Sequence, residues 1–108
     1  MTVSVKVVGV KSEIANLEEE VVEEATKELH RNAIKAFAGI KRATPVDTGR
    51  ARNSWFLDRD KTSVTFTNNV DYIKPLNEGH SKQAPPRFIE QVIFRFLGVI
   101  PQVKYFKK

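Results

Sequence analysis

The feature that most constrains this 108-residue chain is one long amphipathic stretch near its beginning. From Ser12 to about Ala43, apolar residues recur every three or four positions, as on one face of an α-helix: Ile14, Leu17, Val21, Ala25, Leu29, Ala33, Phe37 and Ile40. Thirty helical residues would span about 45 Å, whereas a globule of this size has a radius of gyration of about 13 Å. The helix therefore either breaks near Gly39 or offers part of its apolar face to another subunit.

Both ends of this stretch carry the signals of a helix terminus. Ser12 can cap the first turn, or Asn16 can do so if the helix begins later. Glutamates dominate the early part and basic residues the late part, which is the order that the helix dipole favours. Pro45 lacks a backbone N–H and stops the helix. The stretch thus predicts a helix with an acidic beginning and a basic end.

Alternation of apolar and polar residues predicts strands on both sides of the helix. Thr2–Val10 is the first, a segment from Arg50 to Leu57 leads into the second, and Thr62–Thr67 is the third. A second helix, apolar on more than one side and therefore expected to be buried on several sides, follows from Arg87 to about Gly98. Val103–Phe106 forms either a last strand or an ordered tail. This order predicts one α+β domain over residues 1–108, with an N-terminal strand, a long helix, an antiparallel β-meander and a C-terminal helix.

Residues typical of turns are concentrated between Thr44 and Arg87. In the turn 44–49, Pro45 fixes one φ angle, Asp47 can bond the backbone two residues on, and Gly49 permits a positive φ. Asn68-Asn69 predicts a further turn, Pro75 a chain break, and residues 76–86 a loop.

Composition excludes several classes of site. The chain has no cysteine, so disulfides, thiolate metal sites and cysteine catalysis are excluded. No secretory signal and no membrane-spanning run of roughly 20 apolar residues is seen. The net charge of +5 lies entirely in residues 44–108. It indicates either an ordinary solvated surface or a basic face toward nucleic acid or an acidic partner.

Candidates for chemistry are few. His30 is expected to be a solvated helix residue. His80, with Glu78 and Asp71 nearby in sequence, could form an acid–base pair or metal site, but the Glu-x-His spacing is generic, and the alternative is bonding to loop backbone or a neighbouring subunit. Trp55 with Tyr72 could stack nucleic-acid bases, although core packing is the better interpretation. We therefore expect no catalytic residue, cofactor or metal.

Two segments together go beyond a generic pattern. One runs from Ala43 to Trp55 and reads A-T-P-V-D-T-G-R-A-R-N-S-W; the other reads N-V-D-Y-I from Asn69 and continues as L-N-E-G-H-S-K-Q-A-P-P to Pro86. Over roughly residues 10–97, this pair resembles the minor tail-component family of long-tailed bacteriophages, the tail-completion or neck proteins. In that family a long helix ends in a P-V-D-T-G turn, a strand follows, and a proline loop precedes a final helix.

The resemblance implies a virion protein without enzymatic activity, made in the host cytoplasm, with no cofactor and no membrane contact. It would sit at the head-proximal end of the tail. Its partners would be copies of itself in a homo-oligomeric ring, expected to be a hexamer, and tail terminator, head-completion or stopper, or tape-measure proteins. DNA in the neck lumen could touch its basic face. Alternatives are a tail terminator ring protein or, in another class, a basic nucleic-acid-binding module.

The motif residues expected at interfaces or in rigid connecting loops are Pro45, Val46, Asp47, Thr48, Gly49, Arg50, Arg52, Trp55, Tyr72, Glu78, Gly79, His80, Pro85 and Pro86. Arg50 and Arg52 are expected to pair with acids such as Glu78 across a loop or between subunits.

Overall fold

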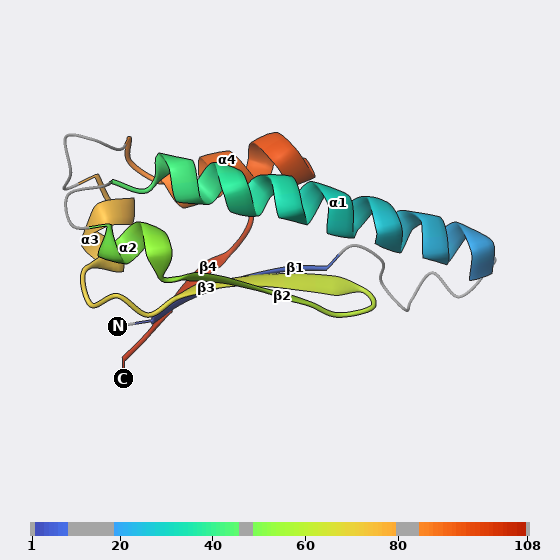
Figure 1. The fold of residues 1–108 in the computed structure, drawn as a ribbon, viewed down its shortest axis with the longest axis horizontal. Coiled ribbons are helices and arrows are strands. Elements are labelled where there is room, and N and C mark those ends of the chain that lie inside the picture. Colours follow the sequence, from blue (N-terminus) through green and yellow to red (C-terminus); the bar gives the residue numbers. More distant parts are fainter. Residues whose placement is uncertain (1, 9–18, 46–48, 80–84, 108) are drawn as a thin grey trace.

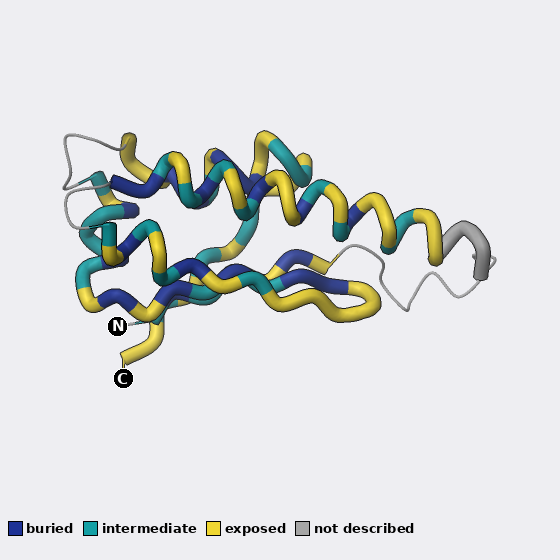
Figure 2. Tube along the Cα trace, viewed as in Figure 1, coloured by how far each residue is buried: buried dark blue, intermediate teal, exposed yellow. Residues whose placement is uncertain are grey.

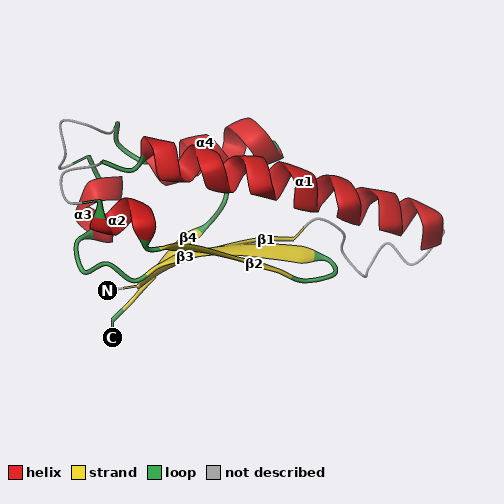
Figure 3. Ribbon diagram, in the orientation of Figure 1, coloured by secondary structure: helices red, strands yellow, loops and turns green. Residues whose placement is uncertain are grey.

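The computed structural model describes residues 2–8, 19–45, 49–79 and 85–107, with the backbone alone for 19–22. Within these residues the elements are, in order, β1 (Thr2–Val8), α1 (Glu19–Ala43), α2 (Arg50–Asn53), β2 (Trp55–Arg59), β3 (Ser63–Asn68), α3 (Ile73–Asn77), α4 (Phe88–Leu97) and β4 (Val103–Phe106). The helices form one layer and the strands another, so one face of the sheet is covered by helices (Figures 1 and 3). The predicted α+β class is confirmed, and Val103–Phe106 is a strand.

The four described strands form an antiparallel sheet with the order β2-β3-β1-β4. Strands β2 and β3 form the hairpin that the meander pattern predicted, and the N-terminal strand lies between β3 and β4. Helix α1 connects β1 to β2 across β3, and α4 connects β3 to β4 across β1. This is the split βαβ arrangement, which carries many unrelated functions and therefore specifies none by itself.

The core lies between the sheet and the α1–α4 layer (Figure 2). Alternate residues of each strand face it, and each long helix contributes one stripe. Its buried apolar members are Val3, Val5, Val7, Leu29, Ala33, Ala36, Ile40, Trp55, Val64, Phe66, Ile73, Phe88, Ile89, Val92 and Ile93. Ser4, Lys6, Thr65 and Thr67 alternate with these residues on the two central strands and lie on the uncovered face.

Helix α1 runs through Gly39 without a break, so the alternative of a break there was wrong. Gly39 lies where α1 and α4 pack together: a Cβ added to it would be 2.7 Å from Cε2 of Phe96 and 3.1 Å from Cγ1 of Val92. A side chain at this position would therefore require the Phe96 ring to move. The 25 residues of α1 span about 37 Å, and the N-terminal end of the helix projects beyond the sheet (Figure 1). The cap expected at Ser12 lies outside the described residues.

Three other local predictions differ from the structure. Arg50–Asn53 is a single helical turn before β2 instead of a run into the strand. Pro75 does not break the chain but lies in the first turn of α3, where its missing N–H would have no intrahelical partner anyway. Helix α4 is also not buried on several sides, because the Phe94 side chain is 54% exposed. Asn68 ends β3 and also begins the predicted turn, because its Oδ1 accepts from the Val70 N–H two residues on at 3.0 Å.

Candidate functional site

The first motif builds a buried hydrogen-bonded corner at the C-terminal end of α1. Thr44 is fully buried, and its hydroxyl donates to the Ile40 carbonyl oxygen at 2.6 Å. The same hydroxyl accepts a hydrogen bond from Nε1 of Trp55 at 2.8 Å. The Trp55 side chain is 6% exposed and belongs to the core, which confirms the packing interpretation over base stacking. The motif thus joins the end of α1 to the first residue of β2.

Arg52 holds the same corner from α2. Its Nε and Nη2 donate to the Thr44 carbonyl at 3.3 and 3.1 Å, and its Nη2 also donates to the Arg42 carbonyl at 3.1 Å. A cation is favourable here because the last carbonyls of a helix carry partial negative charge. Within the chain, Arg52 therefore binds helix carbonyls instead of Glu78, and the alternative of a pair between subunits stays a prediction. Glu78 lies 3.9 Å from Nζ of Lys74 in a largely exposed ion pair, which contributes little to stability.

Two further residues of this corner fix α2. Gly49 has a φ of 70°, as predicted, and its carbonyl accepts from the Asn53 N–H at 3.0 Å. Nδ2 of Asn68, at the end of β3, donates to the Ala51 carbonyl at 2.8 Å. Pro45 is buried and Arg50 is exposed. The motif residues Val46, Asp47 and Thr48 lie outside the described residues.

Asn77 organises the second motif, although the sequence analysis did not single it out. The buried Asn77 side chain donates through Nδ2 to Oε1 of Glu90 at 2.7 Å and to the Tyr105 hydroxyl at 2.9 Å. Its Oδ1 accepts from the N–H of Ile89 at 3.0 Å. The residue at the N-cap position of α4, Arg87, has a φ of 58° and makes no side-chain cap. Asn77 therefore caps α4 from another helix and also ties it to β4.

Gly79 and Pro86 bring the two ends of the second motif together. Gly79 has a φ of 93°, and a Cβ on it would lie 2.8 Å from Cγ of Pro86. Only glycine satisfies both the backbone angle and this contact. Tyr72 is partly buried and Pro85 is exposed. His80 and the loop residues up to 84 lie outside the described residues.

Near Asn77, the group with a shifted pKa is the Tyr105 phenol. Burial raises the pKa of the Tyr105 phenol; the hydrogen bond from Asn77 acts in the opposite direction, and the charges of Glu90 and Glu78 add to the rise.

His30, expected to be solvated, instead binds the β2–β3 turn, with its Nε2 2.7 Å from the Asp60 carbonyl oxygen. Among the described residues, no group of three or more His, Cys, Asp or Glu side chains is arranged to hold a metal. Nor does that part of the chain contain a helix long and apolar enough to cross a membrane.

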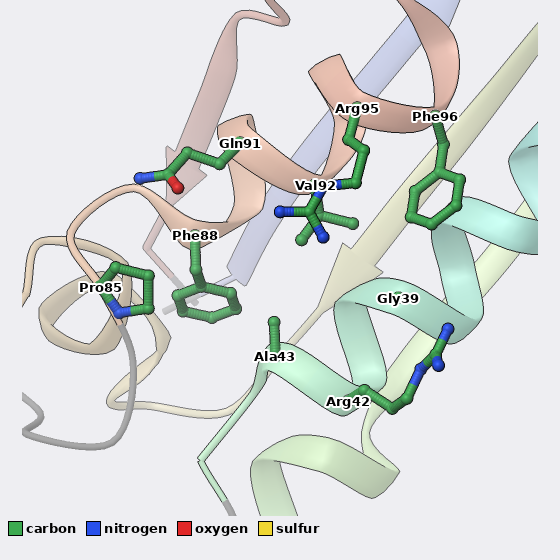
Figure 4. Close-up of a pocket in the computed structure, with 9 residues that line it drawn as sticks. All are labelled: Gly39, Arg42, Ala43, Pro85, Phe88, Gln91, Val92, Arg95 and Phe96. Atoms are coloured by element: carbon green, nitrogen blue, oxygen red, sulfur yellow. The ribbon is translucent and has the colours of Figure 1, made fainter.

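A groove of about 520 Å³ lies between the C-terminal half of α1 and α4 (Figure 4). Apolar side chains line much of it, among them Phe88, Val92 and Phe96. Arg42 comes from α1 and Arg95 from α4, and both side chains are exposed. This groove could not be predicted from the sequence, because its two arginines lie far apart along the chain and only the packing of α4 on α1 brings them together.

Comparison of the chain with protein-family models, with curated proteins and with solved structures finds no match. The resemblance to the minor tail-component family thus stands on the two motifs alone.

Proposed function

We propose that this chain is a bacteriophage virion structural protein of the tail-completion or neck type. It would close the head-proximal end of the tail and help to join head and tail through protein–protein contacts. The observation that carries the proposal is the pair of motifs, segments 43–55 and 69–86, whose residue pattern resembles that family. Both motifs lie between the two long helices, where a connector protein needs a fixed geometry.

The hydrogen bonds of the motif residues support a structural role over a catalytic one. The polar side chains of the corner that the first motif builds bind backbone carbonyls or the Trp55 indole, as seen for Thr44, Arg52 and Asn68. Asn77 binds the first turn of α4 and the Tyr105 hydroxyl. A nucleophile or general base needs a free polar atom within reach of a substrate, whereas these atoms are occupied in holding elements together. We therefore propose that the protein is not an enzyme.

Exposed apolar side chains would supply contacts to copies of the chain and to neighbouring tail proteins. The large ones in the described residues are Val8, Ile34, Phe56, Phe94, Val99, Ile100 and Phe106. Scattered exposed apolar residues are normal on monomers, but Phe56 at 63%, Ile100 at 82% and Phe94 at 54% exposure are large groups to leave in water. In a ring of copies, such groups would become buried.

The test is the location of the protein in particles of a phage that carries the gene. We expect mass spectrometry to find the chain in purified virions, and antibody labelling to place it between head and tail. Deleting the gene should leave heads and tails unjoined, and a plasmid copy should restore joining. Infectious, joined particles without the chain would refute the proposal. Labelling would also separate a completion protein from a tail terminator by its position in the neck.

The basic nucleic-acid-binding module remains the alternative, because the +5 charge lies in residues 44–108 and two arginines flank the groove. Four-stranded sheets that bind RNA stack bases on aromatic residues of their exposed face. Here the two central strands carry Ser4, Lys6, Thr65 and Thr67 on that face, and its exposed aromatic residues, Phe56 and Phe106, lie apart on the two edge strands. Binding to DNA at about 50 mM salt that weakens steeply with added salt would favour the alternative.

A further inference from the structure

We infer that the groove between α1 and α4 is a docking site for the acidic first half of α1 from a second copy of this chain. The inference rests on the proposed function in one respect, namely that an assembly of copies brings the second chain to the groove. It goes further by naming the two surfaces that meet. Its basis is the distribution of charge along α1 and the composition of the groove.

Helix α1 is divided by charge. Residues 19–31 contain five glutamates against Lys27 and Arg31, whereas residues 32–43 contain three basic residues and no acidic one. The helix dipole favours this order, but its effect is limited to the first and last turns. Glu28 and Lys35 lie beyond those turns. Helix stability alone therefore does not account for the division.

The glutamates of the acidic half that the structure describes in full, Glu23, Glu24 and Glu28, are exposed, and the helix is buried only from Leu29 onward. In Figures 1 and 2 this end of α1 projects past the sheet and past α4. The ion pair between Glu24 and Lys27, at 3.7 Å, is exposed on both sides and so holds neither side chain firmly. The acidic residues are thus presented to a partner.

The groove has the complementary character. The apolar lining residues with accessible surface are Ala43, Pro85 and Phe96, whereas Phe88 and Val92 are buried in the core, and Arg42 and Arg95 are the charged residues that line the groove. Neither guanidinium forms an ion pair or hydrogen bond with another residue in the part of the chain that the structure describes. An apolar floor with basic rims suits one face of an acidic amphipathic helix, the helix-in-groove mode of recognition. A bare phosphate would use the arginines but not the floor.

A single chain cannot satisfy both surfaces itself. Glu24 and Arg42 are eighteen residues apart in one helix, about 27 Å along its axis. At physiological salt the screening length is about 8 Å, so these charges do not neutralise one another. Because the two surfaces differ, a contact between them leaves one of each unused on the outer chains, and the contact repeats until a ring closes.

Charge reversal on each surface tests the contact. Arg42→Glu with Arg95→Glu makes the groove acidic, and Glu23→Lys, Glu24→Lys and Glu28→Lys make the helix half basic. We expect each variant alone to self-associate about tenfold or more weakly than the wild type, since attractive pairs become repulsive. An equimolar mixture of the two variants should recover assembly, because each acidic surface then meets a basic one. A variant that merely misfolds cannot produce this recovery.

The readouts are mass in solution by native mass spectrometry and sedimentation, and circular dichroism to check folding. Arg59→Glu with Lys61→Glu is the matched control for the groove variant: it changes the net charge by the same amount, on exposed residues of the β2–β3 hairpin that belong to neither proposed surface, and should leave the state of assembly unchanged. Raising the salt to about 1 M, where the screening length is about 3 Å, should weaken wild-type assembly.

Several results would overturn the inference. A wild type that stays monomeric up to about 1 mM, where a contact of millimolar Kd is half formed, lacks the contact. Charge-reversal variants that assemble as the wild type does would exclude these surfaces as the contact. A mixture of the two variants that fails to assemble would exclude them as well. If the groove variant assembles as the wild type does but no longer binds DNA, the groove is a phosphate-binding site instead. If the chain is found in virions but does not form this contact, the inference is wrong and the proposed function stands. If the chain forms the contact but is absent from virions, the proposed function is wrong and the inference stands.

Discussion

Replacing Thr44 by valine should destabilise the protein although it changes almost no volume. The Thr44 hydroxyl is the acceptor for Nε1–H of Trp55, and both residues are buried. The Ile40 carbonyl, which also loses the hydroxyl, keeps the Thr44 backbone N–H at 3.0 Å as its donor. Thr44→Val therefore leaves one buried donor unpaired, the indole N–H, at a cost of about 1–3 kcal/mol. The free energy of unfolding of a small domain is about 5–15 kcal/mol in total, so this is a large loss of stability.

Urea unfolding followed by fluorescence measures this directly, because Trp55 is the sole tryptophan. If the free energy of unfolding falls with urea concentration as steeply as in typical small proteins, the urea concentration at the unfolding midpoint should fall by about 1 M. Thr67→Val on the uncovered sheet face is the matched control and should change stability by less than about 0.5 kcal/mol.

A double-mutant cycle isolates the pair. Trp55→Phe removes the indole N–H, so Thr44→Val made in the Trp55→Phe background should cost much less than in the wild type. Because Trp55→Phe also removes the sole tryptophan, all four proteins of the cycle are followed by circular dichroism. Coupling between the two sites below about 0.5 kcal/mol would refute the reasoning that this hydrogen bond holds the corner.

Three further outcomes follow from other contacts. Gly39→Leu should cost about 1–3 kcal/mol in thermal unfolding because the new side chain would displace the Phe96 ring; an equal effect from Ala38→Leu, on the exposed side of α1, would contradict this. Asn77→Ala should cost about 1–3 kcal/mol in urea unfolding, since the buried Ile89 N–H loses its acceptor, and an unchanged midpoint would count against the capping role. Because burial raises the pKa of Tyr105 above its ordinary value near 10, its contribution to stability is complete below that pH and is lost as the pH rises through the folded-state pKa. Tyr105→Phe should flatten this alkaline decline in a pH series of melting curves.

Elements with a strong local period were predictable from the sequence. The three- and four-residue spacing from Leu29 to Ile40 corresponds to the buried face of α1, and the alternation of Val3, Val5 and Val7 corresponds to the buried face of β1. The positive φ of Gly49 was also predictable, because turn chemistry depends on neighbours in sequence. Such features need no information on what packs against them.

Features set by distant contacts were not predictable in the same way. Gly39 looked like a helix breaker because its reason, the close approach of Phe96, comes from a helix more than fifty residues later. Asn68 does begin the predicted turn. Its bond to the Ala51 carbonyl and the capping of α4 by Asn77 could not be predicted, since an amide side chain does not reveal which distant backbone it will bind. Arg52 was assigned an acidic partner by charge, whereas helix carbonyls offered a closer one. The groove of Arg42 and Arg95 exists only through the packing of α4 on α1.

The division between motif and surface determines which experiments can address function. Thr44, Arg52, Gly79 and Asn77 each hold two or more elements in place, so substitutions there will lower stability and assembly together. Loss of joining in such variants would not distinguish an unfolded protein from a lost contact. Reversing an exposed charge on α1 or α4 costs less stability, about 0.3–1 kcal/mol where it opposes the helix dipole, as at Arg42 and Arg95, and a recovery on mixing depends on contact alone. If the motifs act as connectors, as we propose, the residues that meet partners are to be sought among the exposed ones that the motifs hold in position.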